Sequence, residues 1–511
     1  MLIDPRTPVI VGVGQVSDSI DEPDYQRMSS VDLAAEASRR AIADAGADLS
    51  RVAASIDLIA GVRQFEISGP MPAPLGRSDN YPRSVAQRLG IEPARAVLEV
   101  VGGQGPQRLI TEFAGAIAAG GLDVALVMGS DAISTERYFV RRDDRPDFTE
   151  TAAGSLEDRG FGYELFIDEN LVEHAVMGAP TQYGLLENAR RARLGADRDD
   201  YRRQMAQLFA PFTAVAAKNP LAATPMVRTV DELATVTAGN RMICDPFPRL
   251  LVARDLVNLG AAALVMSLAT ARGLGVPAER MVFLRGHADL REQPLLERPD
   301  LGAAPTAWTA AREALRVAGI GLDDIATFDL YSCFPVAVSN FCDGTGLTGD
   351  DPRGLTLTGG LPFFGGPGNN YSMHAIADTV ERMRESPGAF GLVGANGGIM
   401  SKYSVGVYST APADWAADRS AELQHAVTAA PAVTARRRAA TAGAAVAAWI
   451  ETYTVRHAFE PRTAVIVGRS HADGSRFLAT MPPEDLGAAD PIGRDIIVTS
   501  SEQGNTAVLA S

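Results

Sequence analysis

A glycine-rich turn at residues 100–107, VVGGQGPQ, has the composition of a site that receives an anion or a reacting carbonyl oxygen. An apolar run enters this turn, and the segment that follows it, residues 109–121, is predicted to form a helix. Backbone N–H groups point outward at the N-terminus of a helix and favour negative charge there. The turn therefore predicts either binding or chemistry, and the other residues of the chain must decide between the two.

Cysteine and histidine do not form a recognisable reactive or metal-binding pattern. The three cysteines, Cys244, Cys333 and Cys342, include no C-x-x-C pair and are too few for a disulfide framework. The six histidines are scattered singly, so their spacing gives no zinc-type ligand set. We therefore expect no metal site.

Charge and hydropathy exclude two classes of partner. The formal net charge of −15 argues against a nucleic acid as ligand. The N-terminus lacks a basic region followed by a long apolar stretch, and the longest uncharged run is too short to span a bilayer. These patterns predict a cytoplasmic protein with no membrane partner.

The elements that must position the turn repeat along the chain. Residues 41–58 and 314–330 share Ala, Gly, Leu and Asp at matching places, and each copy reads as the end of a helix, a turn and a strand after an extended apolar stretch. The turn at 102–107, GGQGPQ, has a counterpart in GGPGNN at 365–370, and each is followed by a helix-length segment and an apolar strand. Alternating strands and helices predict α/β layers, and the duplication predicts two similar halves about a pseudo-twofold axis.

This organisation resembles the thiolase superfamily, whose two βαβαβαββ halves form α-β-α-β-α layers with a loop domain inserted in the first half. Residues 174–191 and 218–222 are similar to the loop-domain pattern of that family, and residues 243–267 to the return into the first half. The chain is similar to thiolase-like proteins of type 1, which carry an extra C-terminal domain. The implied boundaries are 1–278 for the N-terminal half, with the loop domain inserted at about 131–240, 279–412 for the C-terminal half, and 413–511 for a linker and the additional domain.

The resemblance also locates the catalytic side chains of the family, and other residues stand at those places. Gly103 replaces the nucleophilic cysteine, and Gly366 replaces the histidine of a Gly-His-Pro motif. Ala395 or Asn396 replaces the cysteine of a Cys-x-Gly motif. Because the thiolate and its activating groups are missing, we expect the acetyl-CoA acetyltransferase activity that the resemblance implies to be lost in its conventional form.

The backbone part of a thiolase site needs no particular side chain. In the family, an N–H at the nucleophile position and an N–H in the Cys-x-Gly-Gly turn hold the thioester carbonyl. The resemblance transfers these donors to Gly103, Gly397 and Gly398, with Gly366 beside them. It implies a coenzyme A thioester as substrate or ligand and no other cofactor. The alternative is that these glycines only permit tight packing of helices on strands.

Two phenols and one histidine are the remaining candidates for acid–base chemistry. Residues 331–334, YSCF, resemble the Tyr-Asp-x-Phe form of thiolase-like retro-aldolases, which cleave β-hydroxyacyl-CoA without an acyl-enzyme, although Ser332 stands where their acid would be. A phenol can carry a proton when its pKa is lowered, and Tyr371 is a candidate second phenol in the pocket of Tyr331. His374 is a candidate base if its loop is remodelled. The alternatives are that Tyr331 plugs an emptied site and that His374 is an ordinary packed side chain.

The composition changes after about residue 412. An alanine-rich linker is followed by five short alternating runs, separated by turn signals such as ADGS and EQGN. Five strands at this spacing predict a small OB-like β-barrel. In the retro-aldolases a separate OB-fold chain partners the thiolase-like chain, and a fused module fits the same arrangement.

The sequence thus predicts a thiolase-superfamily protein that handles acyl-CoA thioesters or related lipids, as a monomer or homodimer. Two alternatives stay open at this point. The protein is a non-catalytic acyl-CoA or lipid-binding protein, or it is an aldolase-type C–C lyase that acts on β-hydroxyacyl-CoA.

Overall fold

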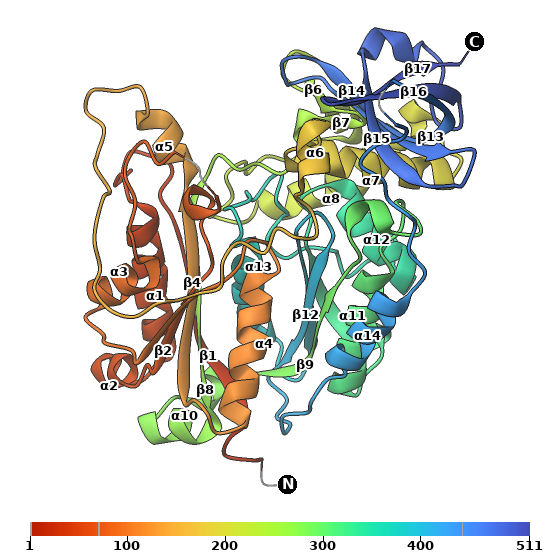
Figure 1. The fold of residues 1–511 in the computed structure, drawn as a ribbon. Coiled ribbons are helices and arrows are strands. Elements are labelled where there is room, and N and C mark those ends of the chain that lie inside the picture. Colours follow the sequence, from red (N-terminus) through yellow and green to blue (C-terminus); the bar gives the residue numbers. More distant parts are fainter. Residues whose placement is uncertain (1–2, 70–71, 442, 511) are drawn as a thin grey trace.

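The computed structural model describes residues 3–69, 72–441 and 443–510, and it has five alternating layers of helices and strands (Figure 1). Two central helices, α4 (Gly105–Ala118) and α13 (Tyr371–Glu385), lie between the strands of the two halves. Buried side chains such as Leu109, Ile110 and Met373 make this middle layer the centre of the core. The expected α-β-α-β-α order is confirmed. The outer helices are α1 (Ser30–Asp44), α2 (Leu49–Ala54), α3 (Tyr81–Leu89) and α10 (Leu268–Leu274) on one side and α11 (Pro305–Ala318) and α12 (Pro335–Thr345) on the other.

The strands of both halves join edge to edge in the order β10-β11-β12-β9-β1-β8-β4-β2-β3-β5. The two halves meet where β1 pairs with β9, and this contact is short, with Val9 opposite Phe283 and Ile10 opposite Val282. The strands are β1 (Pro8–Ser17), β2 (Leu58–Gly61), β3 (Arg95–Leu98), β4 (Val124–Ala132), β5 (Glu157–Asp158), β8 (Asn258–Ser267), β9 (Val282–Arg291), β10 (Ile325–Leu330), β11 (Phe390–Gly397) and β12 (Lys402–Ser409).

The internal repeat has a direct structural expression. A Cβ atom on Gly12 of β1 would lie 1.9 Å from the carbonyl oxygen of Ala41 on α1, and a Cβ on Gly286 of β9 would lie 2.0 Å from that of Ala314 on α11. Each half therefore needs a glycine in its first strand so that the following helix can pack directly on the backbone. The repeated strand–helix–strand unit of the sequence is confirmed.

The C-terminal half differs from the βαβαβαββ pattern in one place. Among the described residues, the third strand of the pattern is absent between α12 and α13. The segment around Thr356–Thr358 lies in its place. The Asp329 carboxylate accepts hydrogen bonds from the N–H groups of Leu357 and Thr358, at 2.9 and 3.0 Å, and from both threonine hydroxyls. Since these backbone donors are committed to a side chain, they are not available to a strand ladder.

The insertion between β4 and β8 forms a largely helical loop domain above the central helices (Figure 1). Its short strand β5 pairs in parallel with β3 and so covers the outer edge of the large sheet. Its other elements are α5 (Ile133–Phe139), α6 (Glu169–Glu173), α7 (Ala179–Arg193), α8 (Arg198–Ala216), α9 (Val230–Ala234), β6 (Met242–Cys244) and β7 (Phe247–Pro248).

The C-terminal region is the five-stranded barrel that the sequence predicts, preceded by α14 (Ser420–Ala429) in the linker. The strands follow the order β14-β15-β17-β16-β13, and pairing of β14 with β13 closes the barrel. The hairpin β6–β7 of the loop domain extends this sheet, since Cys244 pairs with Arg456. The barrel strands are β13 (Ala445–Arg456), β14 (Thr463–Ser470), β15 (Arg476–Met481), β16 (Asp495–Ser501) and β17 (Gly504–Leu509).

The barrel packs on the loop domain through α7. The Thr452 hydroxyl of β13 donates to the carbonyl of Leu185 at 2.7 Å, and the Asn188 amide donates to the carbonyl of Tyr453 at 3.0 Å. The described part of the chain contains no helix that is both long and apolar enough to cross a membrane.

Candidate functional site

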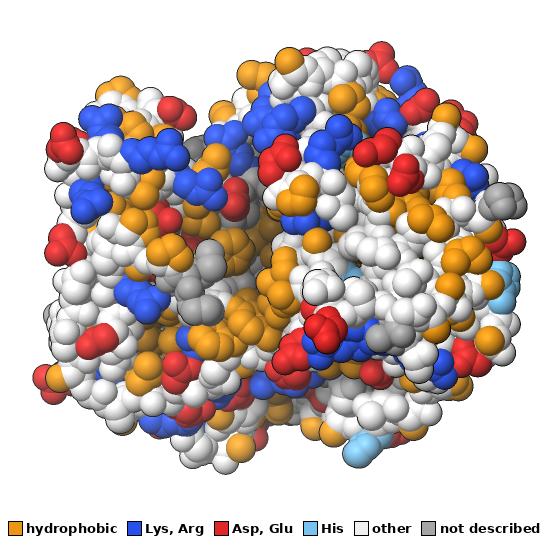
Figure 2. Space-filling view, turned by 45° about the horizontal axis from the view of Figure 1, so that its top comes forward, with side chains coloured by type: hydrophobic (Ala, Val, Ile, Leu, Met, Phe, Trp, Pro, Cys, Tyr) orange, Lys and Arg blue, Asp and Glu red, His pale blue; other side chains and the backbone are white. Residues whose placement is uncertain are grey.

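A cavity of about 760 Å³ lies at the N-terminal ends of the two central helices, beneath the loop domain. Five of the seven residues singled out in the sequence line it. Figure 2 shows this end of the molecule hollowed between its two sides, with hydrophobic side chains along the hollow and Lys and Arg side chains gathered beside it. The five predicted residues are Gly103, Tyr331, Gly366, Gly397 and Gly398.

The first glycine turn is fixed on both sides of Gly103. The Gly102 N–H donates to Asn369 Oδ1 at 3.0 Å, and the Gly102 carbonyl accepts from the Gly105 N–H at 2.9 Å. The Gly103 carbonyl accepts from the Ser372 hydroxyl at 2.6 Å. The Gly103 N–H, in contrast, donates to no residue that the structure describes. The turn therefore presents one fixed, unused donor at the cavity wall.

The second turn, residues 397–400, touches the first. A Cβ on Gly397 would lie 2.8 Å from the Gly103 nitrogen, so only glycine allows the two turns to meet. Gly398, Ile399 and Met400 all have positive φ angles, 57°, 59° and 55°. A left-handed conformation is unfavourable for a β-branched residue, and strain of this kind persists where the surroundings impose it, often at functional sites. Within the described residues, the Gly398 N–H also has no hydrogen-bond acceptor.

Tyr331 occupies the space that a nucleophile on Gly103 would need. A Cβ on Gly103 would lie 2.2 Å from the Tyr331 hydroxyl oxygen and 2.4 Å from its nearest ring carbons. The ring packs edge-on against Tyr371, with 5.5 Å between ring centroids. Burial, with a smaller contribution from Cys333, raises the pKa of Tyr331 far above its usual value. The lowered pKa that a proton-abstracting phenol requires is therefore absent, and the hydroxyl is a hydrogen-bond donor at neutral pH.

The cysteines are not thiolates. Cys333 lines the cavity next to Tyr331, and burial raises its pKa to about 12. Burial also raises the pKa of Cys244 and of Cys342 to about 12. Because the thiolate is the nucleophilic form, none of the three is activated at neutral pH.

Tyr371 and His374 do not belong to the described lining of this cavity. The Tyr371 hydroxyl donates to Asp329 Oδ1 at 3.0 Å and lies 2.6 Å from the Thr358 hydroxyl, in a buried polar cluster. His374 is fully buried on α13, and its Nδ1 lies 2.6 Å from Gln15 Oε1. Burial lowers the pKa of His374 to about 3, so the ring is neutral.

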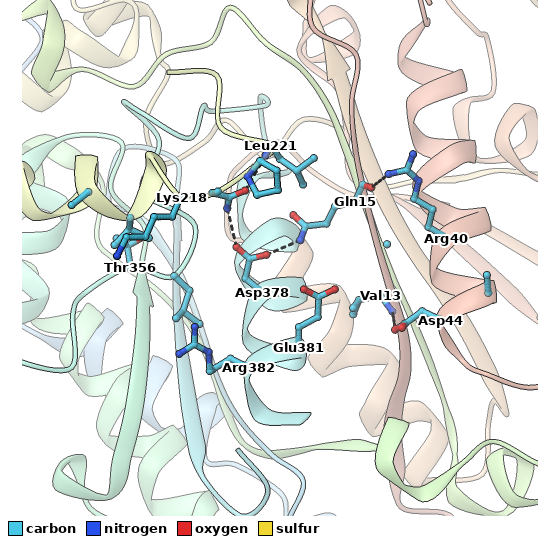
Figure 3. Close-up of a pocket in the computed structure, with 17 residues that line it drawn as sticks. Val13, Gln15, Arg40, Asp44, Lys218, Leu221, Thr356, Asp378, Glu381 and Arg382 are labelled. Carbon is cyan, nitrogen blue, oxygen red and sulfur yellow. Dashed lines mark hydrogen bonds between the residues drawn. The ribbon is translucent and has the colours of Figure 1, made fainter. Parts of the chain in front are cut away.

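Gln15 belongs to a second and larger cavity of about 930 Å³, between β1, α1, α13 and the end of α8 (Figure 3). There the Gln15 amide donates to Asp378 Oδ1 at 2.7 Å, and the Asp44 carboxylate is paired with Arg280 and Arg384. None of the predicted glycines lines this second cavity. The first cavity is therefore the candidate site, although it is the smaller of the two.

Four arginines that the sequence did not single out line the candidate cavity. No described carboxylate lies within 4.0 Å of any of their guanidinium groups, in a chain whose net charge is −15. The Nε atoms of Arg228 and Arg254 are buried without a hydrogen-bond partner among the described residues. Unpaired guanidinium groups at a cavity are suited to phosphate or carboxylate ligands. The four are Arg228, Arg241, Arg249 and Arg254.

Aromatic rings form the remaining wall. Tyr183 of α7 stacks on Phe334 with 4.3 Å between centroids, and Tyr163 packs edge-on against Phe166 at 5.7 Å. All four rings line the cavity. The site thus combines an apolar wall, two free N–H donors and a cationic cluster, which is a suitable surface for a long ligand with an anionic end.

Comparison with solved structures decides the family. The chain is 56% identical to a monomeric SCP2-thiolase-like protein type 1 from Mycobacterium smegmatis, with 100% of each chain covered and a TM-score of 0.86. The chain belongs to the SCP2-thiolase-like protein type 1 family. The family model described as the thiolase-like protein type 1 additional C-terminal domain matches residues 422–507 of this type 1 protein. No curated protein sequence matches it.

Two more distant structures share the fold of the type 1 protein. One is the Ltp2-ChsH2(DUF35) aldolase, at 19% identity and a TM-score of 0.55, with 79% of this chain and 98% of that chain covered. The other is human mitochondrial 3-ketoacyl-CoA thiolase, at 16% identity and a TM-score of 0.56, with 80% of this chain and 100% of that chain covered. The predicted thiolase fold is confirmed.

Proposed function

We propose that this type 1 protein binds an acyl-CoA thioester in the candidate cavity and does not form an acyl-enzyme. The thioester carbonyl oxygen accepts hydrogen bonds from the N–H groups of Gly103 and Gly398. The observation that carries this proposal is the fixed turn around Gly103, in which the neighbouring groups Gly102 N–H and Gly103 C=O are engaged and the Gly103 N–H is not. Fixed donors of this kind need no reorganisation when a carbonyl arrives.

The rest of the cavity fits the remainder of the ligand. The phosphates of coenzyme A suit the four arginines, because guanidinium groups bind phosphate in bidentate geometry. The aromatic wall of Tyr163, Phe166, Tyr183 and Phe334 suits the pantetheine arm and the acyl chain. The volume of about 760 Å³ lies in the range of small-molecule sites.

Thermal unfolding with added ligand tests this proposal. Binding to the folded state alone adds roughly 2.7 kcal/mol of stability at a hundredfold excess over Kd. We expect CoA and acetyl-CoA to raise the Tm, with the larger rise for acetyl-CoA because only the thioester offers a carbonyl to Gly103. An unchanged Tm at millimolar concentrations of both ligands contradicts the proposal.

A second candidate function, C–C cleavage of a β-hydroxyacyl-CoA, is favoured by one observation. The Tyr331 hydroxyl makes no hydrogen bond to a described residue, and its raised pKa keeps it protonated at the cavity. In a retro-aldol cleavage, loss of the β-hydroxyl proton breaks the C–C bond, a ketone leaves, and the Tyr331 proton passes to the resulting enolate carbon. Asp255, a carboxylate of the same cavity, is the candidate acceptor of the hydroxyl proton.

Tyr331→Phe separates the two functions, because it removes only the hydroxyl. For a lyase, we expect cleavage of a β-hydroxyacyl-CoA panel by the parent and a loss of about 10²–10⁴-fold in rate in the variant. For a binding protein, we expect no cleavage by either protein and equal affinity for acyl-CoA. Equal turnover by parent and variant excludes the proton-donor role.

A further inference from the structure

Lys402 is a buried cation without an anionic partner. It begins β12, and only 3% of its surface is exposed. No described carboxylate lies within 4.0 Å of its ammonium group, which lies 5.2 Å from the centre of the Phe166 ring. An unpaired buried charge is costly, so the structure around Lys402 has to compensate it by other contacts.

Those contacts are two backbone carbonyls from two different segments that contribute to the wall of the candidate cavity. The Lys402 ammonium donates to the Val101 carbonyl at 3.1 Å and to the Gly162 carbonyl at 2.6 Å. Val101 enters the glycine turn, and Gly162 lies in the loop that carries the aromatic residues Tyr163 and Phe166. One ammonium group therefore joins the carbonyl-binding turn to the aromatic wall from behind.

The contact with Val101 completes the fixation of the turn. The Val101 carbonyl and the Gly102 N–H belong to one peptide unit, and that unit is held at its two ends by Lys402 and Asn369. Rotation of this unit would move the next N–H, that of Gly103. The position of the free donor thus depends on Lys402.

We propose that Lys402 is the positioning residue of the thioester site: it sets the Gly103 N–H and adds positive charge behind the bound carbonyl oxygen. This inference rests on the proposed function. The charge of the Lys402 ammonium group changes with pH near neutrality, because burial lowers the pKa of Lys402 to about 8. The charged groups around the ammonium are Glu164 of the loop, Glu99 after β3, Arg108 of α4 and Arg291 of β9.

The test compares acetyl-CoA with S-ethyl-CoA, a thioether of the same size that lacks the carbonyl. Lys402→Met keeps an unbranched side chain of similar length and removes the positive charge. We expect it to weaken acetyl-CoA binding about tenfold, as for loss of a charge-assisted hydrogen bond, and to leave S-ethyl-CoA binding nearly unchanged. Lys218→Met is the matched control, since Lys218 is the only other lysine of the chain and lies at the second cavity.

A pH profile of the parent protein supplies a second measurement that needs no substitution. We expect the preference for acetyl-CoA over S-ethyl-CoA to fall as the pH rises from 7 to 9.5, and Lys402→Arg to keep the preference across that range. A flat profile in the parent overturns the inference, as does an unchanged preference in folded Lys402→Met. If Lys402→Met does not fold, the profile decides alone. Failure of the parent to bind any CoA compound overturns the proposed function instead.

Discussion

At the scale of single residues, the site has a glycine at position 103 and a tyrosine ring in the space beside it. The resemblance to thiolases predicts that Gly103 stands where the family carries its nucleophile, and in this structure the phenol of Tyr331 fills the space of a side chain at Gly103. Gly103 does not have a positive φ angle, so its backbone would accept another residue. The nearest obstacle to a side chain at Gly103 is therefore the ring of Tyr331.

Because a side chain at Gly103 and the Tyr331 ring would occupy the same space, substitutions at the two positions should be coupled. Gly103→Cys should overpack the site against Tyr331 and lower the free energy of unfolding by about 1–3 kcal/mol. Tyr331→Ala in the same chain should relieve the clash, so that the double variant loses less stability than the sum of the losses of the two single variants. Melting curves of the two single variants and the double variant measure this coupling. Strict additivity of the two effects argues against the proposed contact.

A second residue-scale prediction concerns the unpaired arginines. Arg228→Gln combined with Arg249→Gln should raise the Kd for CoA about tenfold or more, because charge-assisted hydrogen bonds to phosphate are lost. The same double change at Arg39 and Arg203, which are exposed and paired with Glu36 and Asp231, is the control. Calorimetric titration at low and high salt measures the effect. Equal Kd values for the two double variants would remove the arginines from the site.

At the scale of elements, α13 serves two cavities with different faces. Its N-terminus supplies Ser372 to the glycine turn, and a later turn supplies Asp378 to the second cavity. Burial, opposed by the hydrogen bond from Gln15, raises the pKa of Asp378 to about 7. Between pH 4 and pH 7 the folded chain therefore keeps a proton that the unfolded chain has released.

The sign of the resulting pH dependence follows from linkage. The folded state binds more protons in this window, so the contribution of Asp378 to stability is lost as the pH rises from 4 to 7. Asp378→Asn cannot ionise, and we expect its Tm relative to the parent to increase by at least about 2 °C between pH 4.5 and pH 8. Glu385→Gln, on the same helix and exposed, should show no such trend. A parallel pair of curves for Asp378→Asn and the parent contradicts the raised pKa.

The sequence predicted the helices and strands better than it predicted which side chains contact one another in the site. The repeat predicted the order of strands and helices correctly, because in each half a glycine of the first strand, Gly12 or Gly286, lets the following helix pack directly on the strand. The glycine turns were found because their composition is distinctive. His374 is a candidate base only if its loop is remodelled, whereas the structure places it on α13 with its ring against Gln15, which lies 359 positions away in the chain.

The contacts that hold the turn could not be predicted from the sequence, although Asn369 itself belongs to the GGPGNN segment at 365–370. Asn369, Ser372 and Lys402 act through contacts across 267 to 301 positions of sequence, which no local pattern reveals. The four arginines were hidden for a different reason. Arginine accounts for nearly all of the 47 basic residues, so only the absence of nearby carboxylates in the fold distinguishes them.

At the scale of the whole molecule, the additional domain packs behind α7, one of the helices that line the site. The face of α7 opposite the cavity packs on β13, and Thr452, Asn188 and the β6–β7 hairpin join the barrel to the loop domain. The barrel interior is filled by its own apolar side chains, including Ile450, Ile466 and Phe477. The described contacts therefore make it a support for α7.

The short strand β5 has a consequence for behaviour in dilute solution. Uncovered edges of sheets are places where a second chain can add, and β5 covers the edge at β3, where Arg63 contacts Asp158 and Arg95 lies 2.9 Å from Glu157. A chain that covers this edge with its own strand needs no second chain there, unlike an obligate dimer that pairs through such an edge. We therefore expect the same Tm from nanomolar to tens of micromolar protein, and an Arg63→Ala, Arg95→Ala variant whose Tm becomes concentration-dependent as partners meet at the exposed edge. We thus expect a two-residue strand to make the folded state of this molecule independent of protein concentration.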